Sequence, residues 1–258
     1  MGLFDFIKNL FPYRTKGKNN KIYIVLKNKK KVLKRKLSGL DINISGDNNT
    51  IILHYPIYFK NSLIQMEGNN SSFEMLASHS PMCNTKIYLK NNDHIYIGAF
   101  SKFNTGNIKI MVNNNPKDKP SYLKIGNSVQ VGENVRIRTS DGHAIFNQNE
   151  NLPYNAPEDV ISGNNVWLGL SSTILTGAHI PSNTIVAAHS LVNKKFEESG
   201  TILAGLPAKV IKRNIRWDSC GYGFLVENSE HKYKSDKCTI IKKYLHRKFI
   251  ELKCKFFF

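Results

Sequence analysis

Aliphatic residues recur every six positions along the middle of this chain. The interval runs from Ile125 to Val131 and Ile137, is interrupted, and then returns in a second block. That block has five successive members: Leu168, Ile174, Ile180, Val186 and Val192. An α-helix repeats its faces every 3.6 residues and a strand every 2, so neither element fits this interval. A triangular prism with one short strand and one corner for every six residues does fit it.

The same spacing predicts how successive coils of the prism stack. Three six-residue units close a coil of 18 residues, which places Leu168 over Val186 and Ile174 over Val192. Neighbouring coils then lie ~4.8 Å apart and are joined by ladder hydrogen bonds. The fifth position of each unit is small or β-branched, which lets the corner close: Val166, Ser172, Ala178, Thr184 and Ser190. We therefore expect a parallel β-helix whose first-position aliphatic residues point inward.

A looser repeat precedes the regular one. Asn pairs follow alternating aliphatic residues at 48–49, 69–70 and 91–92, in steps of 21 and 22 residues. Asn tolerates the left-handed backbone region better than most residues with a side chain, so it suits a solenoid corner. These pairs predict that wider coils begin near residue 42.

Positive charge is in excess throughout the 258-residue chain. Lys and Arg number 37 against 19 Asp and Glu, which gives a formal charge of +18 at pH 7. Such an excess attracts nucleic acid, membrane headgroups, acidic polysaccharides or phosphate-rich cofactors. A base-composition bias of the gene, visible as abundant Lys and Asn, is the alternative explanation.

Cysteine spacing and hydropathy bear on the compartment. The four Cys residues form no CxxC pair and no disulfide or zinc pattern, which favours a reducing cytoplasm. No stretch reaches the roughly 20 apolar residues of a spanning helix, and the first residues lack the order of a signal peptide. We expect a cytoplasmic protein.

Three segments are predicted. Residues 1–40 begin with apolar residues at helical spacing and contain the run "KNKKKVLKRK" at 27–36. A short amphipathic helix there would dock onto the main domain or rest on an anionic membrane surface. The run lacks aromatic residues, so nothing favours base stacking or a nucleic-acid partner. Residues 41–212 form the β-helix, and 213–258 form a basic extension that packs over the last coil or contacts an anionic polymer or a membrane.

A family resemblance rests on the regular block. The stretch "ISGNNVWLGLSSTILTGAHIPSNTIVAAHSLVNKK" at 161–195, followed by "ILAGLPAKVIK" at 202–212, resembles the hexapeptide-repeat acyltransferases. The similarity is greatest to sugar and capsular polysaccharide O-acetyltransferases, and it covers about 121–212. The resemblance implies a left-handed parallel β-helix, a homotrimer, acetyl-CoA in the groove between adjacent prisms, and no metal.

His143 lies where the regular spacing breaks. Counting in sixes from Ile125 places His143 at the start of a new coil, yet the pattern resumes only at 162. Residues 144–161, with Pro153 and Pro157, are therefore expected to leave the prism as a loop. A loop on a rigid solenoid is a common place for a functional site. A histidine at its root can accept the proton of a sugar hydroxyl and pass it to a thiolate leaving group.

The resemblance assigns further residues. It implies that His143 is the catalytic base and that Trp167 lines the acceptor or thioester site. Asp141 is a candidate to orient the imidazole, with Glu150, Glu158 and Asp159 as alternatives. Family-matched cofactor positions are Leu170 and Ala188 for the pantetheine arm, and Lys194, Lys209 and Lys212 for the phosphates of CoA.

The leading interpretation is an acetyl-CoA-dependent O-acetyltransferase that modifies a hydroxyl of a surface glycan, which the charge suggests is an acidic capsule chain. The alternatives are N-acetylation of a nucleotide-linked amino sugar, a metal-dependent hydratase that would need His143, His179 and His189 to converge, and a non-catalytic solenoid that binds polysaccharide.

Overall fold

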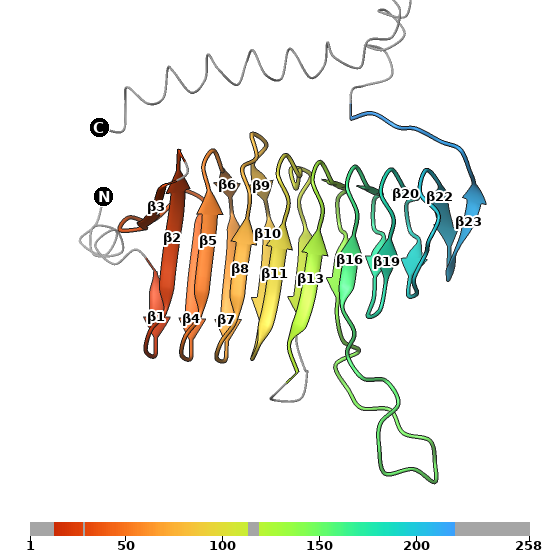
Figure 1. Ribbon diagram of the computed structural model, residues 1–258, viewed down its shortest axis with the longest axis horizontal. Helices are drawn as coiled ribbons and strands as arrows, with labels where there is room; N and C mark the ends of the chain where they lie inside the picture. The colour runs from red at the N-terminus through yellow and green to blue at the C-terminus, as the bar shows by residue number, and fades with distance from the viewer. Residues whose placement is uncertain (1–12, 28, 113–118, 220–258) are drawn as a thin grey trace, which may run out of the picture. The chain divides into compact units, whose positions relative to one another are not determined.

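The computed structural model describes residues 13–27, 29–112 and 119–219. These residues contain 23 strands and no helix. The predicted N-terminal helix and the end of the basic extension lie outside the described residues. Strands follow one another around three sides of a prism, so each coil passes through a first, a second and a third sheet (Figure 1).

The first and second sheets contain eight strands each. In the order of pairing, the first sheet consists of β1 (Arg14–Lys16), β4 (Leu40–Ser45), β7 (Ser62–Glu67), β10 (Thr85–Leu89), β12 (Ile108–Val112), β15 (Arg136–Arg138), β18 (Thr173–Ile174) and β21 (Leu191–Val192). The second sheet consists of β3 (Lys29–Val32), β2 (Lys21–Leu26), β5 (Thr50–His54), β8 (Ser72–Met75), β11 (Asp93–Ile97), β13 (Ser121–Ile125), β16 (Val160–Ser162) and β19 (His179–Ile180).

The third side of the prism has shorter strands. The third sheet consists of β14 (Gln130–Val131), β17 (Trp167–Leu168), β20 (Ile185–Val186), β22 (Ile202–Gly205) and β23 (Ala208–Lys212). Earlier coils contribute the pair β6 (Phe59–Lys60) and β9 (Met82–Cys83). Pairing is parallel throughout, except where β3 and β23 fold back antiparallel at the two ends.

The six-residue repeat forms the core as predicted. Leu168 pairs with Val186 and Ile174 pairs with Val192, in register. All aliphatic first positions are buried, as are the small fifth positions from Val166 to Ser190. The predicted left-handed parallel β-helix is therefore confirmed.

The early coils use Asn corners, as the Asn pairs predict. One residue of each pair has a left-handed backbone: Asn48 at φ 60°, Asn70 at φ 61° and Asn92 at φ 54°. Between these coils the Asn48 amide donates to the Asn70 carbonyl oxygen at 3.2 Å. The winding starts before residue 41, because β1 pairs with β4 and β2 pairs with β5.

The predicted loop leaves the prism at the corner between the first and second sheets, which we call the loop corner. It follows β15 and returns at β16, and Figure 1 shows it projecting away from the stacked coils. The expected range of 144–161 is wrong at its end, because Val160 and Ile161 already pair with Leu123 and Lys124 of β13. Val160 is buried, so inward alternation resumes two residues before Ser162.

Candidate active site

The base of the loop is held together by one side chain, Asn155. Its amide nitrogen donates to the carboxylate of Asp141 at 3.0 Å and to the backbone oxygen of His143 at 2.8 Å. Its side-chain oxygen accepts the backbone N–H of Ile145 at 2.8 Å. Every second residue from 141 to 145, on the arm that leaves the prism, is thus hydrogen-bonded to a single residue of the arm that returns to it. This arrangement fixes the backbone from which the His143 imidazole projects.

The His143 side chain is exposed at this corner. The prediction that Asp141 orients the imidazole finds no direct hydrogen bond within the described residues. The Asp141 carboxylate instead accepts from Asn155, and the Asp141 backbone oxygen accepts from Arg138 at 3.3 Å. The Asp141 carboxylate is thus bonded to the returning arm of the loop through Asn155.

The returning arm is tied to neighbouring coils. The backbone N–H of Glu158 donates to the Thr176 hydroxyl at 2.8 Å, and Asp159 accepts the backbone N–H of Tyr122 at 2.9 Å. Glu158 and Asp159 thus hold the exit of the loop. No hydrogen bond within the described residues links either carboxylate, or Glu150, to the His143 imidazole.

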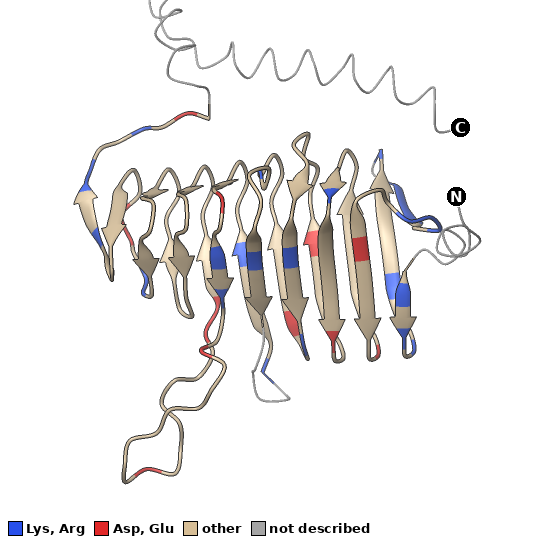
Figure 2. Ribbon diagram, turned by 180° about the vertical axis from the view of Figure 1, so that it is seen from behind, with Lys and Arg blue, Asp and Glu red and all other residues tan. Residues whose placement is uncertain are grey.

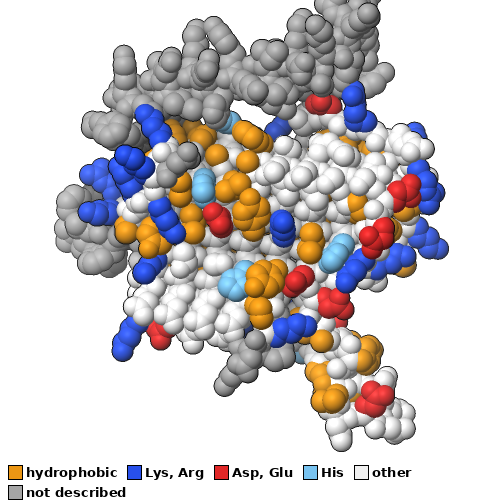
Figure 3. Space-filling model, in the orientation of Figure 1, with side chains coloured by type: hydrophobic (Ala, Val, Ile, Leu, Met, Phe, Trp, Pro, Cys, Tyr) orange, Lys and Arg blue, Asp and Glu red, His pale blue; other side chains and the backbone are white. Residues whose placement is uncertain are grey.

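The loop presents apolar side chains to solvent from its base to its outer part. Leu152 is 78% exposed, Tyr154 62%, Phe146 50% and Ile145 43%. Figure 3 shows hydrophobic side chains at the surface of the projecting arm. Such a cluster is large for a surface that faces only water, and clusters of this kind mark contact surfaces.

Trp167, Leu170 and Ala188 lie on another side of the prism. Trp167 is 41% exposed on β17, where it pairs with Gln130 and Ile185. Leu170 and Ala188 occupy the next corner, between the third and first sheets, in adjacent coils. The Leu170 oxygen accepts the N–H of His189, the residue after Ala188, at 2.8 Å, so the two adjacent coils are bonded at this corner.

The three predicted phosphate contacts divide between these regions. Lys209 and Lys212 are exposed on β23 at the end of the third sheet. Lys194 lies at the loop corner, two coils beyond His143, with its ammonium 5.4 Å from the centre of the Phe196 ring. The Lys194 backbone oxygen accepts the His179 N–H at 3.3 Å.

Within one chain the predicted site residues therefore form two groups. The corner group contains His143, Asp141 and Lys194. The third-sheet group contains Trp167, Leu170, Ala188, Lys209 and Lys212. In a three-sided prism the corner between the first and second sheets lies opposite the third sheet. The topology of a single chain therefore separates the imidazole from the tryptophan.

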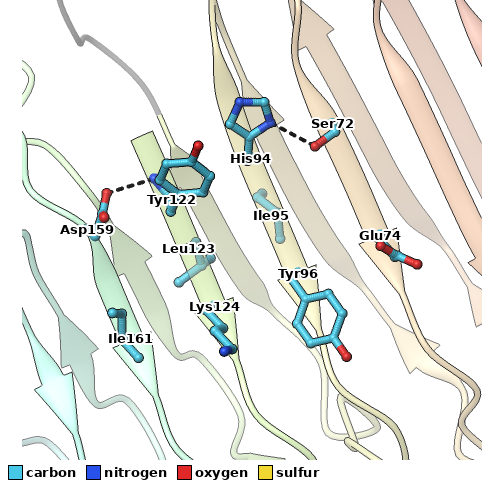
Figure 4. A pocket seen from close by; sticks show the side chains of 10 residues that line it. All are labelled: Ser72, Glu74, His94, Ile95, Tyr96, Tyr122, Leu123, Lys124, Asp159 and Ile161. Carbon is cyan, nitrogen blue, oxygen red and sulfur yellow. Dashed lines mark hydrogen bonds between the residues drawn. The ribbon is translucent and has the colours of Figure 1, made fainter. Parts of the chain in front are cut away.

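A shallow groove lies on the outer face of the second sheet (Figure 4). Its volume is about 450 Å³, and His94 and Tyr122 stack across it with ring centres 5.0 Å apart. The Nδ1 atom of His94 bonds to the Ser72 hydroxyl at 2.8 Å. Burial lowers the pKa of His94, whereas burial and the Glu74 carboxylate raise the pKa of Tyr96.

Of the predicted site residues, Asp159, an alternative to Asp141 for orienting the imidazole, lines this groove, whereas His143, Trp167 and the cofactor residues do not. This groove was not predicted from the sequence, although the outward positions of strands 72–75, 93–97 and 121–125 alternate regularly with buried ones. A second groove, of about 420 Å³, shares Tyr122, Asp159 and Ile161 with it and reaches the returning arm of the loop.

The three histidines of the hydratase alternative do not come together in one chain. His143 is at the loop corner, and His189 is exposed between the third and first sheets with φ 57°. Within the described residues, no group of three or more His, Cys, Asp or Glu side chains could hold a metal ion. The described part of the chain also contains no helix long and apolar enough to cross a bilayer.

A parallel β-helix of six-residue units with a histidine at the root of an inserted loop defines a class of acyltransferases, and comparison with known proteins agrees. No family model matches the chain. A polysialic acid O-acetyltransferase of Neisseria meningitidis is 30% identical over 180 residues, which are 70% of this chain and 80% of that protein. A polysialic acid O-acetyltransferase of Escherichia coli O1:K1 is 34% identical over 95 residues, 37% of this chain and 31% of that protein.

Two solved structures superpose over most of the chain. The polysialic acid O-acetyltransferase OatWY has a TM-score of 0.69 and 27% identity, and the match covers 89% of this chain and 98% of that one. The acetyltransferase NeuO has a TM-score of 0.72 at 23% identity, over 92% of this chain and 99% of that one, and supports the fold alone. The chain belongs to the hexapeptide-repeat O-acetyltransferase family that includes these polysialic acid enzymes. It is an O-acetyltransferase.

Proposed function

We propose that this enzyme transfers the acetyl group of acetyl-CoA to a hydroxyl of an acidic capsular polysaccharide. The observation that carries the proposal is His143, exposed at the root of a loop whose two arms are joined at the base by the hydrogen bonds of Asn155. The acceptor class is supported by the formal charge of +18 and by the polysialic acid named for the Neisseria meningitidis relative. The reaction also supports a cytoplasmic location, because acetyl-CoA is available there.

His143 supplies the proton transfers of this reaction. Its imidazole accepts the hydroxyl proton while the hydroxyl oxygen attacks the thioester carbonyl carbon, giving a tetrahedral oxyanion. The oxyanion collapses, the carbon–sulfur bond breaks, and the imidazolium returns the proton to the departing thiolate. A positioned base of this kind typically contributes 10²–10⁴-fold to the rate. A backbone N–H would stabilise the oxyanion.

The third-sheet group supplies the cofactor surface. Leu170 and Ala188 are exposed in one column beside Gly169, where an added Cβ would come within 2.7 Å of the Ala188 nitrogen. The backbone is thus close-packed there, the small residues Gly169 and Ala188 leave room for an extended pantetheine arm, and the exposed Leu170 offers it an apolar contact. Lys209 and Lys212 form no ion pair with other described residues and are free to meet phosphates as point charges.

A second copy of the chain completes the site. Because the corner group and the third-sheet group lie on different sides of one prism, we propose a homotrimer in which His143 of one copy faces Trp167 of its neighbour. A cyclic trimer brings unlike surfaces of adjacent copies together. The exposed apolar cluster of Ile145, Phe146, Leu152 and Tyr154 gives the loop a surface suited to such a contact.

A thiol-release assay tests this function. The purified full-length enzyme is given acetyl-CoA with polysialic acid, other acidic oligosaccharides, neutral oligosaccharides or UDP-linked amino sugars. We expect rapid thiol release with at least one acidic glycan, and an ester on the product that hydroxylamine removes. Thiol release only with the amino sugar, yielding a hydroxylamine-resistant amide, would contradict O-acetylation of a glycan. No release with any acceptor would contradict the proposal as a whole.

A further inference from the structure

The outer face of the first sheet carries a column of cations. Lys86 pairs with Lys109, and Lys109 pairs with Arg136, so three positive side chains occupy the same outward row of β10, β12 and β15. Figure 2 shows blue bands at one height on these adjacent strands. Strands pair ~4.8 Å apart, so the cationic row rises along the prism axis in steps of that size. We call Lys86, Lys109 and Arg136 the cation ladder.

No member of the ladder forms an ion pair with another described residue, and the nearest acid in the same row, Asp41, lies two strands from Lys86 and pairs with Lys36. The ion pairs there are Lys36–Asp41, His54–Glu74 and Arg213–Glu198, and none involves a member of the ladder. Lys109 lies 5.4 Å from the centre of the Tyr88 ring, and Arg136 donates to the Asn107 backbone oxygen at 2.6 Å. Like charges directly opposite one another in a sheet are destabilising. Repeating such a pairing over three strands costs stability that an anionic ligand would recover.

The row beside the ladder differs in chemistry. Tyr88 pairs with Met111, and Met111 pairs with Arg138, so two flat or flexible apolar side chains precede a fourth cation. The Nε atom of Arg138 is buried and has no hydrogen-bond partner. Cations beside an apolar strip match a polymer that alternates carboxylates with the apolar faces of sugar rings.

The ladder also leads toward the proposed base. Arg136 and Arg138 lie on β15, and the chain passes from Arg138 through Asp141 directly to His143. Arg138 donates to the Asp141 backbone oxygen, which joins the cationic surface to the root of the loop. A polymer bound along β10, β12 and β15 would therefore reach the loop corner.

We propose that the cation ladder is a binding track for the acidic polysaccharide acceptor, separate from the catalytic residues. It holds several carboxylates of one chain while another part of the chain reaches His143. This inference rests on the proposed function for the identity of the ligand, but binding to the ladder is measured without catalysis.

Equilibrium binding without acetyl-CoA tests the track. The full-length enzyme is titrated with polysialic acid, with the same polymer after its carboxylates are reduced to neutral alcohols, with single-stranded DNA and with anionic lipid vesicles. The test variant is Lys86→Gln/Lys109→Gln/Arg136→Gln. The control is Lys29→Gln/Lys30→Gln/Lys31→Gln, which removes the same charge from exposed positions of β3.

We expect the ladder variant to bind polysialic acid at least about tenfold more weakly. The slope of the logarithm of its binding constant against the logarithm of the salt concentration should decrease in magnitude by about two to three. The control should keep most of the affinity, and the reduced polymer should bind neither protein. Equal losses in both variants would overturn the proposal by making the effect one of total charge. A changed oligomeric mass in the ladder variant would overturn it by making the ladder a contact between copies.

Two further outcomes oppose the track. Tighter ladder-dependent binding of DNA or vesicles than of polysialic acid would assign the surface to another class of partner. In the transfer assay, the ladder variant should raise KM for long acceptors and leave KM for a sialic acid dimer unchanged. An equal rise for both lengths would place the ladder in the catalytic site. Absence of all transfer with retained ladder-dependent binding would instead contradict only the proposed function.

Discussion

The loop corner and the third sheet differ in how they present functional side chains. The corner is polar: a buried column runs through Asn49, Ser71 and Asp93 in successive coils, and Asn155 fixes the loop that carries His143. The third sheet exposes Trp167 and apolar corner residues on strands of mostly two residues. The corner thus suits proton transfer, and the third sheet suits the binding of an extended cofactor. Their separation within one chain is the reason for proposing that two copies of the chain together form the complete site.

Replacing His143 should have the largest effect. His143→Ala should lower kcat by about 10²–10⁴-fold, because proton transfer is lost while the exposed side chain supports no packing. The variant should keep its oligomeric mass and its Kd for acetyl-CoA. His189→Asn is a matched control, because it changes an exposed histidine at a left-handed position that Asn tolerates. Near-normal turnover of His143→Ala would show that the loop corner takes no part in catalysis.

Mixed oligomers test whether the two groups meet between copies. His143→Ala and Trp167→Ala chains are each expected to be weakly active. Refolded together in equal amounts, a random trimer should regain about a quarter of the wild-type sites, because one interface in four pairs an intact imidazole with an intact indole. Each variant refolded alone is the control. Mixed oligomers that are no more active than the separate variants would show that both side chains act from the same chain.

Asn155 tests whether the corner needs a rigid base. Asn155→Ala removes the hydrogen bonds to Asp141, His143 and Ile145, so the imidazole should lose its position. We expect kcat to fall by about 10- to 100-fold, with little change in KM for acetyl-CoA. Asn149→Ala changes an exposed residue farther out in the same loop and should have little effect. Equal changes in kcat and in KM for acetyl-CoA would indicate that the loop contacts the cofactor instead.

Lys209 and Lys212 test the cofactor role of the third sheet. Their joint replacement by Ala should raise KM for acetyl-CoA about three- to tenfold, because exposed charge contacts are worth little individually. KM for the glycan should change less. Lys194→Ala extends this comparison to the loop corner. A similar rise in KM for acetyl-CoA would mean that the corner of one copy and the third sheet of another contact the same phosphates. Lys16→Ala/Lys18→Ala is the control, and a larger change in KM for the glycan would reassign the pair.

The regular coils were predictable because periodicity is a local property. Each first-position aliphatic residue is buried for the same reason, so the pattern alone gives the register of Leu168 with Val186. The position of His143 followed from the break in that pattern. The return of the chain to the prism at Val160 could not be predicted from the pattern, because Ser162 is polar and masks the resumed alternation.

Other features depend on contacts that spacing does not encode. Asn155 binds residues across the neck of the loop, and only the closed loop brings them together. The cation ladder joins residues at unequal intervals in the sequence, because turns of different length separate β10, β12 and β15. The location of Trp167 relative to His143 follows from which side of the prism each residue occupies.

Asp93 gives the smallest predicted effect and tests the polar column beneath the corner. Burial raises the pKa of this carboxyl to about 7 from 3.8, against the lowering influence of the Lys90 N–H. The folded state therefore binds the proton more tightly than the unfolded state. The stability that the protonated Asp93 carboxyl contributes should be complete below about pH 4. It should be lost as the pH rises toward 7, at up to ~1.4 kcal/mol per pH unit.

Asp93→Asn should remove this dependence, because its amide stays neutral throughout that range. Denaturant unfolding from pH 4 to 8 should show the variant gaining free energy of unfolding relative to the wild type up to about pH 7 and no further. Ser121→Ala, in the strand paired with Asp93, is the control and should shift stability equally at every pH. A constant difference between Asp93→Asn and the wild type would mean that Asp93 is already ionised in the folded protein at pH 4, and that the corner column tolerates a buried charge.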